Sequence, residues 1–288
     1  MQKELTIILG PTGVGKTDYS IELAKEYSSP IINCDSRQIY KEMNIGTASP
    51  SPEQLEAVRH YFIHSHSVTR YYTAGLYELE AMALLEELFK THDRLVMVGG
   101  SGMYIDALCN GLDDFPPADL QLRDSLMKRL ETEGIESLRN ELRVVDRASY
   151  DTIDIANPQR VVRALEVTLQ TGRKFSDWKS APKKVRPFAI RKIGINRSRE
   201  ELYGRINRRV DIMMEQGLLA EVQGLVQYRD LPALKTVGYR EIFDYFDGVH
   251  SLETAVELIK RNSRHYAKKQ LTYWGRDKEI EWKDFSTL

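Results

Sequence analysis

The chain has 288 residues, a length that predicts about two domains, since single domains commonly run to about 150 residues. Hydrophobic residues make up 42% of the sequence and charged residues 29%, and the mean hydropathy is -0.43. This composition excludes a mainly disordered chain, because such chains combine few apolar residues with a high net charge. Lysine and arginine total 41 and aspartate and glutamate 42, so the net charge of -1 neither favours nor excludes a nucleic acid as a partner.

The cysteines and the apolar runs indicate the cellular setting. Cys34 and Cys109 are the two cysteines; they form no CxxC pair and are too few for a disulfide framework. The apolar run near the N-terminus is shorter than the core of a signal peptide, and no stretch approaches the roughly 20 apolar residues that span a bilayer. We therefore expect a cytoplasmic protein with no membrane partner, and a monomer as the simplest assembly.

The first part of the chain alternates short apolar runs with helical patterns. Residues 5–9 (LTIIL), 31–34 (IINC) and 95–98 (LVMV) predict strands. Residues 17–27 and 76–89 repeat their apolar side chains near the helical period of 3.6 and predict helices. Strands that alternate with helices predict an α/β fold, with a parallel sheet covered by helices on both faces.

A second domain interrupts this pattern. The double proline at 116–117 breaks the chain, and the apolar spacing that follows is helical, without strand signals. We therefore predict an inserted all-helical domain over residues 113–184, within a core formed by residues 1–112 and 185–288. Strand-like alternation returns at residues 187–195 (PFAIRKIGI), and helical spacing follows around residues 202–213 and 252–274.

Charge is unevenly distributed along the chain. Residues 159–192 contain ten basic and two acidic residues, and residues 260–276 contain six basic and no acidic ones, so the remainder carries a net charge of -15. Such segregation predicts a basic surface for a polyanion, and Tyr266, Tyr273 and Trp274 add rings on which bases can stack. The alternative interpretation is that the basic residues only solvate helix faces and a loop.

The sequence GPTGVGKT lies between the first predicted strand and the first predicted helix, and it matches the phosphate-loop pattern GxxxxGK[ST] in full. Backbone N–H groups of such a loop converge on phosphate oxygens, the lysine neutralises charge and the threonine hydroxyl ligates Mg2+. The motif specifies a polyphosphate but not which one. The residues expected to bind it are Gly10, Pro11, Thr12, Gly13, Val14, Gly15, Lys16 and Thr17.

Two further turns are predicted at the same edge of the sheet. Asp35 follows the second strand, where its carboxylate can act as a general base, or else simply cap a turn. Residues 99–102 (GGSG) follow the third strand and lack the acidic residue with which an ATPase holds magnesium and water. This argues against ATP hydrolysis, and a glycine-rich turn lets a flat group approach the backbone.

Eight segments together resemble one family. They are GPTGVGKT (10–17), CDSRQIYK (34–41), NIGTA (44–48), VGGSGMYIDAL (98–108), NPQRVVRALEV (157–167), LYGRINRRVDIMMEQGLLAEV (202–222), KTVGYREI (235–242) and AKKQLTYWGRD (267–277). Across nearly the whole chain, these segments are similar to the tRNA dimethylallyltransferase family. No zinc-finger ligands close the sequence, so the resemblance is to the bacterial type.

The resemblance implies a P-loop NTPase-like sheet and a prenyl transfer. Dimethylallyl diphosphate would alkylate N6 of the adenine on the 3′ side of the tRNA anticodon, with Mg2+ as cofactor and diphosphate as leaving group. Asp35 would deprotonate or hydrogen-bond N6, and Lys16 and Thr17 would complete the catalytic set. One arginine of the run RINRR (205–209), with Arg205 preferred over Arg208 and Arg209, would assist the diphosphate. The segment 159–192 would grip the anticodon stem. The residues implied to contact tRNA are Asp35, Ser36, Arg37, Gln38, Ser101, Arg123, Gln159, Arg160, Val161, Val162 and Arg163. The family usually has threonine where this chain has Ser101, and the hydroxyl is retained.

Two other functions are compatible with parts of the sequence. A small-molecule kinase of the phosphate-loop type would use the same loop, although residues 99–102 and the basic segments count against it. A nucleotide-gated RNA-binding protein without chemistry would bind tRNA and leave its adenine unchanged, and Asp35 would then be dispensable.

Overall fold

The computed structural model of the protein describes residues 2–112, 115–178 and 184–286. The chain forms two compact units: unit 1 consists of Met1–Cys109 and Arg186–Leu288, and unit 2 of Asn110–Val185. The sequence placed the inserted domain at residues 113–184, so the observed junctions differ from it by a few residues. No helix in the described part of the chain is long and apolar enough to cross a membrane.

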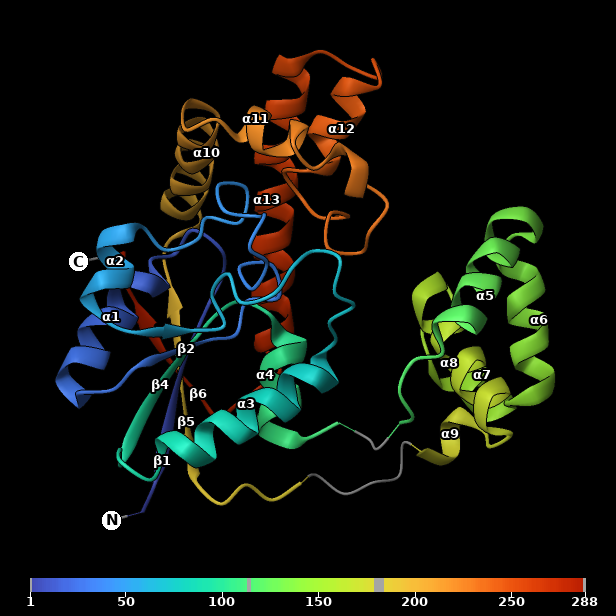
Figure 1. Ribbon diagram of the computed structural model, residues 1–288, viewed down its shortest axis with the longest axis horizontal. Coiled ribbons are helices and arrows are strands. Elements are labelled where there is room, and N and C mark those ends of the chain that lie inside the picture. Colours follow the sequence, from blue (N-terminus) through green and yellow to red (C-terminus); the bar gives the residue numbers. More distant parts are fainter. Residues whose placement is uncertain (1, 113–114, 179–183, 287–288) are drawn as a thin grey trace. The chain divides into compact units, whose positions relative to one another are not determined.

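Unit 1 is built on a parallel sheet with the strand order β3-β2-β4-β1-β5-β6 (Figure 1). This confirms the predicted α/β class. The pattern of apolar runs missed two edge strands: β3 has only two residues, and most side chains of β6 are exposed. The strands are β1 (Glu4–Leu9), β2 (Ile31–Asn33), β3 (His60–Tyr61), β4 (Arg94–Val98), β5 (Ala189–Asn196) and β6 (Ile280–Asp284).

Alternate side chains of the strands enter two apolar layers, because successive residues of a strand face opposite sides of a sheet. Leu5, Ile7 and Leu9 of β1 pack with Tyr77 of α3 on one face. Ile8 packs on the other face with residues of α1 and α10. The helices of unit 1 are α1 (Lys16–Tyr27), α2 (Pro52–Ala57), α3 (Ala74–Leu88), α4 (Gly102–Asn110), α10 (Arg199–Glu215), α11 (Leu218–Gln223), α12 (Arg240–Phe246) and α13 (Leu252–Trp274).

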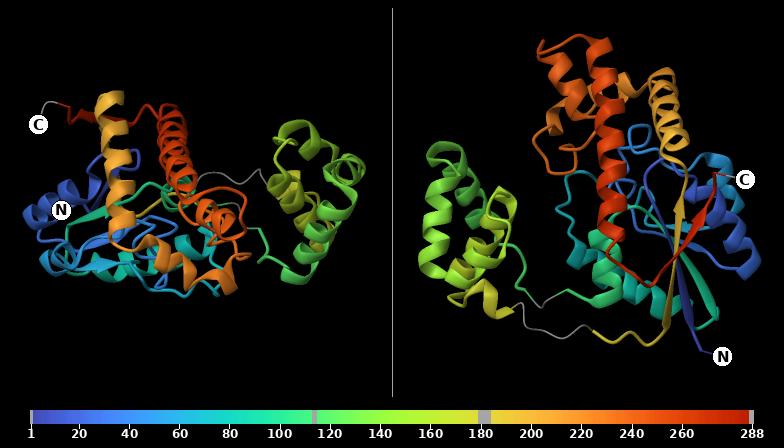
Figure 2. Two further views of the ribbon diagram at one scale, coloured as in Figure 1. Left: turned by 90° about the horizontal axis from the view of Figure 1, so that it is seen from above. Right: turned by 180° about the vertical axis from the view of Figure 1, so that it is seen from behind.

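Strand order decides which loops meet. β4 lies between β1 and β2, so the turns after these strands are neighbours at the carboxyl edge of the sheet. These turns carry the phosphate loop, residues 99–102 and Asp35, in segments that are far apart in the sequence. Helices α10 and α13 follow the fifth strand and pack side by side (Figure 2).

The described elements of unit 2 are all helices, and side-chain caps set where several of them begin. Asp119 accepts hydrogen bonds from the first turn of α5, and Asn157 does the same for α8, which has Pro158 at its first position. The apolar stripes of α5, α6 and α8 form a core of their own. The helices are α5 (Leu120–Glu133), α6 (Ile135–Val145), α7 (Arg147–Thr152), α8 (Pro158–Thr171) and α9 (Phe175–Trp178).

Candidate active site

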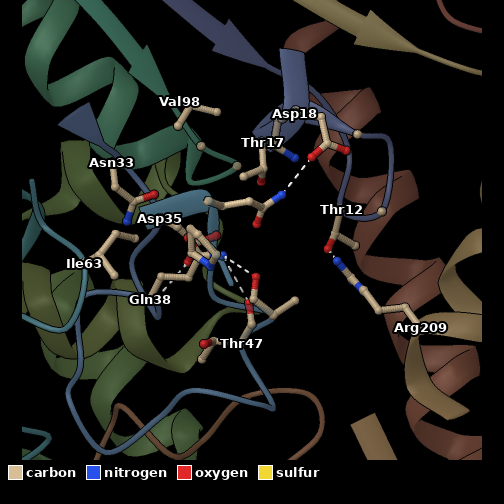
Figure 3. A pocket seen from close by; sticks show the side chains of 18 of the residues that line it. Thr12, Thr17, Asp18, Asn33, Asp35, Gln38, Thr47, Ile63, Val98 and Arg209 are labelled. Carbon is tan, nitrogen blue, oxygen red and sulfur yellow. Dashed lines mark hydrogen bonds between the residues drawn. The ribbon is translucent and has the colours of Figure 1, made fainter. Parts of the chain in front are cut away.

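A cavity of about 410 Å³ opens in unit 1, where the turns after β1, β2 and β4 meet (Figure 3). Its walls come from the phosphate loop, the turn after β2, residues 47–50, and helices α10 and α13. Much of the site expected from the sequence lines it. The expected residues on its walls are Thr12, Gly13, Gly15, Lys16, Thr17, Asp35, Gln38 and Arg205.

The phosphate loop ends where α1 begins. Gly15 has φ of 107°, a left-handed conformation that glycine adopts without strain, and it lets the chain turn directly into the helix. The Lys16 ammonium donates hydrogen bonds to the carbonyl oxygens of Gly10 and Pro11, both at 2.9 Å. Burial lowers the pKa of Lys16 to about 8, while the nearby carboxylate of Asp35 acts in the opposite direction.

Helix α10 presents arginines to this loop. Nε of Arg205 donates to the carbonyl oxygen of Gly13 at 2.9 Å, and the Arg209 guanidinium donates to the Thr12 hydroxyl at 2.6 Å. Burial lowers the pKa of Arg209 to about 10. The sequence predicted that an arginine of residues 205–209 assists the diphosphate, with Arg205 preferred. Arg209 lies four residues further on, shares a face of the helix with Arg205 and lines the same cavity. Arg208 also lines the cavity.

Asp35 both caps a turn and lines the cavity. Its Oδ1 accepts the backbone N–H of Arg37 at 2.8 Å and that of Gln38 at 3.3 Å. The turn and general-base interpretations are therefore geometrically compatible, because both capping bonds use one of the two carboxylate oxygens. Ser101 supports the same turn: its hydroxyl accepts the N–H of Ser36 at 2.8 Å and donates to the Ser36 hydroxyl at 3.1 Å.

Gln270 of α13 connects two walls of the cavity and was not among the predicted site residues. Its Oε1 accepts the backbone N–H of Thr12 at 2.8 Å, and its Nε2 donates to the carbonyl oxygen of Gly100 at 2.8 Å. The side chain is buried, and these two partners determine which way the amide faces. The bridge joins the phosphate loop to the glycine-rich turn after β4.

The charged side chains around the cavity favour an anion. Lys16 and three arginines of α10 line it, against the carboxylates of Asp18 and Asp35. Thr17 also lines the cavity, and its hydroxyl is of the chemical type that could ligate a magnesium ion if phosphate oxygens and water supplied the other ligands. Within the described residues, no cluster of three or more His, Cys, Asp or Glu side chains is suited to hold a metal.

The predicted RNA contacts of unit 2 have structural partners. Glu166, which is fully buried, pairs with Arg123 at 2.8 Å and with Arg163 at 2.6 Å, and Gln159 accepts a bond from Arg123 at 3.2 Å. The Arg160 side chain is 61% exposed and lies 4.0 Å from Asp154. Arg160 is thus the residue of this group that offers an accessible charge.

For two residues of the same group, the predicted contact with RNA is wrong. Val161 and Val162 have no exposed surface and pack in the core of unit 2. They are core residues and not RNA contacts, because the apolar face of α8 points inward while only the opposite face meets solvent.

Part of the positive charge of the segment 159–192 is neutralised within unit 1. Its last three cations lie in unit 1 and pair with carboxylates: Arg186 with Glu78, Arg191 with Glu281 and Lys192 with Asp277, each at 2.7 Å. The expectation that the whole segment grips RNA is therefore wrong for these residues, whose charge is neutralised within the fold.

Comparison with known proteins identifies the family of this chain. A family model described as IPP transferase matches residues 38–277. The tRNA dimethylallyltransferase 1 of Bacteroides thetaiotaomicron is 50% identical over 278 residues, which cover 96% of this chain and 90% of that protein.

Solved structures resemble the whole chain as well. The full-length tRNA isopentenylpyrophosphate transferase from Bacillus halodurans matches with a TM-score of 0.72 and 34% identity, covering 98% of this chain and 90% of that one. A eukaryotic dimethylallyltransferase acting on tRNA matches with a TM-score of 0.82 and 26% identity, covering 98% and 74%. Since the family model and the relatives span most of the sequence, the chain belongs to the IPP transferase family, which includes the tRNA dimethylallyltransferases.

Proposed function

We propose that this protein transfers a dimethylallyl group from dimethylallyl diphosphate to N6 of the adenine on the 3′ side of the tRNA anticodon. The observation that carries the proposal is that a phosphate loop and a carboxylate face the same cavity, in a chain that is half identical to a tRNA dimethylallyltransferase. The similarity of these relatives favours prenyl transfer over a small-molecule kinase.

In the proposed reaction, N6 forms a bond to C1 of the dimethylallyl group while the bond from C1 to the diphosphate oxygen breaks. The electron pair of that bond leaves with the diphosphate, and the N6 proton passes to Asp35. Lys16, Arg205 and Arg209 line the cavity, which supports a role for them in stabilising the departing charge. Fixed cations at such a site lower the barrier because they need no reorganisation.

We propose Mg2+ as cofactor, held on the protein side by the Thr17 hydroxyl. When bound, the ion would neutralise charge on the diphosphate, and most of its ligands would be oxygens of the substrate and water. The cation-lined cavity supports this role, since an anionic group fits there and brings its own ligands for the metal.

The base must leave the stacked anticodon loop to reach the cavity, and single-stranded loops are the parts of RNA that proteins read by sequence. Ser36, Arg37, Gln38 and Ser101, in the turns after β2 and β4, are proposed to receive this nucleotide. Arg160 and other exposed cations of unit 2 are proposed to contact the stem. A monomeric, cytoplasmic enzyme remains our expectation from the sequence.

The test is to incubate the protein with an anticodon stem-loop RNA, Mg2+ and dimethylallyl diphosphate, and to weigh the RNA. We expect a mass gain of one dimethylallyl group in place of one hydrogen. The matched variant is Asp35→Asn: its amide oxygen still accepts the N–H groups of Arg37 and Gln38, but it cannot take a proton. Transfer should fall by about 100- to 10,000-fold, with the melting temperature unchanged.

Other outcomes separate the alternatives. An RNA whose mass stays constant while ATP is consumed with a small acceptor would favour a kinase. Tight tRNA binding with no mass change would favour an RNA-binding protein without chemistry. Full activity of the Asp35→Asn variant would contradict the role of Asp35 as the base.

A further inference from the structure

The loop of residues 44–48 (NIGTA) forms a wall of the cavity, yet the mechanism above gives it no task. Thr47 and Ala48 line the cavity. Ala48 has φ of 51°, in the left-handed region that residues with a Cβ atom rarely adopt. A strained conformation of this kind persists only where the surroundings impose it, so contacts from elsewhere in the fold must hold the loop.

One carboxylate on helix α11 holds the first part of the loop. Oε2 of Glu221 accepts the backbone N–H of Asn44 at 3.0 Å and that of Ile45 at 2.7 Å, and Oε1 accepts the N–H of Gly46 at 2.9 Å. An ionised carboxylate only accepts hydrogen bonds, so three consecutive N–H groups suit it well. The partners are more than 170 residues apart in the chain.

A fourth bond completes this arrangement. The hydroxyl of Tyr239, which is fully buried, donates to Oε1 of Glu221 at 2.7 Å. The Tyr239 ring also lies against the loop: a Cβ atom added at Gly46 would stand 2.6 Å from Cε2 of this ring. Glycine is therefore required at this position for close approach.

The other end of the loop is tied to the reacting groups. Nε2 of Gln38 donates to the carbonyl oxygens of Thr47 at 3.2 Å and Ala48 at 3.0 Å, and its backbone N–H donates to Asp35. Asp35, Gln38 and Thr47 lie together on one side of the cavity, away from Thr12 and Arg209 (Figure 3). Hydrogen bonds at both ends of the loop, joined by its backbone and by the Gln38 residue, thus connect Glu221 to the carboxylate of Asp35.

We propose that Glu221 and Tyr239 are positioning residues that hold the loop of residues 44–48, and through Gln38 set the place of Asp35. This inference rests on the proposed function, because it concerns the side of the cavity where the base accepts the proton. It assigns a role to three segments that the mechanism left without one: 44–48, the end of 202–222, and 235–242. Disturbing the arrangement should slow transfer and leave diphosphate binding at the phosphate loop intact.

The test compares Glu221→Gln with Glu215→Gln, a matched change at an exposed glutamate of α10. The new amide sets an NH2 group against backbone N–H donors, so the loop shifts. Small displacements of catalytic groups are costly, and we expect turnover of RNA to fall by about tenfold to a hundredfold in the Glu221 variant. Its dissociation constant for inorganic pyrophosphate should stay within about twofold of wild type. The Glu215 variant should match wild type in both measurements.

A double-mutant cycle supplies a second readout. Gly46→Ala should slow turnover because its methyl group collides with the Tyr239 ring. Adding Tyr239→Leu shortens the opposing side chain, so the double variant should be faster than Gly46→Ala alone. Neighbouring residues in contact give such non-additive effects, whereas general loss of stability does not restore activity.

Two results would overturn the inference while the proposed function stands: a folded Glu221→Gln protein with full turnover, or a parallel loss of turnover and pyrophosphate affinity. The second result would mean that the whole cavity had changed shape. A wild-type chain that adds no dimethylallyl group to RNA would overturn the proposed function together with the inference.

Discussion

At the scale of single residues, burial sets the charge state of the phosphate-loop lysine. Lys16 has a pKa lowered to about 8 by burial, so the free protein loses this charge as the pH rises through that value. A bound diphosphate favours the charged form and raises the pKa again. Binding and protonation of this side chain are therefore linked.

We predict that inorganic pyrophosphate binds more weakly as the pH rises above about 8, and that its binding there takes up a proton. The loss should reach about tenfold per pH unit, since one ionisation is involved. Calorimetry in buffers of different ionisation enthalpy measures the proton uptake. Lys25→Met, at an exposed position of the same helix, should behave as wild type. Equal proton uptake by a Lys16→Met protein would contradict the assignment to Lys16.

At the scale of elements, α8 shows how one helix combines a structural face and a charged face. Glu166 points into unit 2 and is fully buried between Arg123 and Arg163, whereas the Arg160 side chain is 61% exposed. A buried carboxylate that loses a partner is destabilised, but a surface cation contributes little to folding. The arginines of this region therefore differ in what they do.

We predict that Arg123→Ala destabilises unit 2 by about 2 kcal/mol, because Glu166 keeps only one cationic partner and Arg123 is itself partly exposed. Arg160→Ala should change stability by less than about 0.5 kcal/mol and weaken tRNA binding. The slope of the logarithm of tRNA affinity against the logarithm of salt concentration should fall by about one, because one phosphate contact is lost. Hydrogen exchange of unit 2 amides and tRNA titrations at several salt concentrations measure these effects. Unchanged exchange in Arg123→Ala would refute the structural role.

At the scale of the whole molecule, the inserted unit leaves and rejoins unit 1 at adjacent points. The backbone N–H of Lys184 donates to the carbonyl oxygen of Asn110 at 2.8 Å, and Nε of Arg186 donates to that of Leu108 at 2.6 Å. Unit 1 also contains the entire lining of the cavity. We therefore expect that the fold of unit 1 and the cavity at its phosphate loop do not require unit 2.

We predict that a protein in which a short Gly-Ser linker replaces residues 110–185 still folds, and still binds pyrophosphate within about threefold of wild type. Its affinity for tRNA should fall at least about tenfold, since the cations of unit 2 no longer neutralise phosphates. Calorimetry and tRNA titration test both parts. Undiminished tRNA affinity would show that unit 2 is not an RNA-binding unit.

Local patterns in the sequence were sufficient for much of this protein. The strand, loop and helix around Lys16 are consecutive in the chain, so the motif and the element boundaries could be predicted together. Asp35 could be placed at the correct edge because parallel strands bring their carboxyl ends to one side. The edge strands β3 and β6 could not be predicted, since β3 has only two residues and most side chains of β6 are exposed.

Taken alone, the sequence determined the α/β class, the phosphate loop, the family resemblance and an inserted helical segment, because each depends on residues that lie close together in the sequence. Only the tertiary structure decided that Gln270 bridges two turns, that Glu221 holds the loop of residues 44–48, and that Arg191 and Lys192 are neutralised by carboxylates near the C-terminus, Glu281 and Asp277. These contacts join residues about 85 to 260 positions apart. These contacts depend on strand order and helix packing, which the spacing of apolar residues along the sequence does not predict.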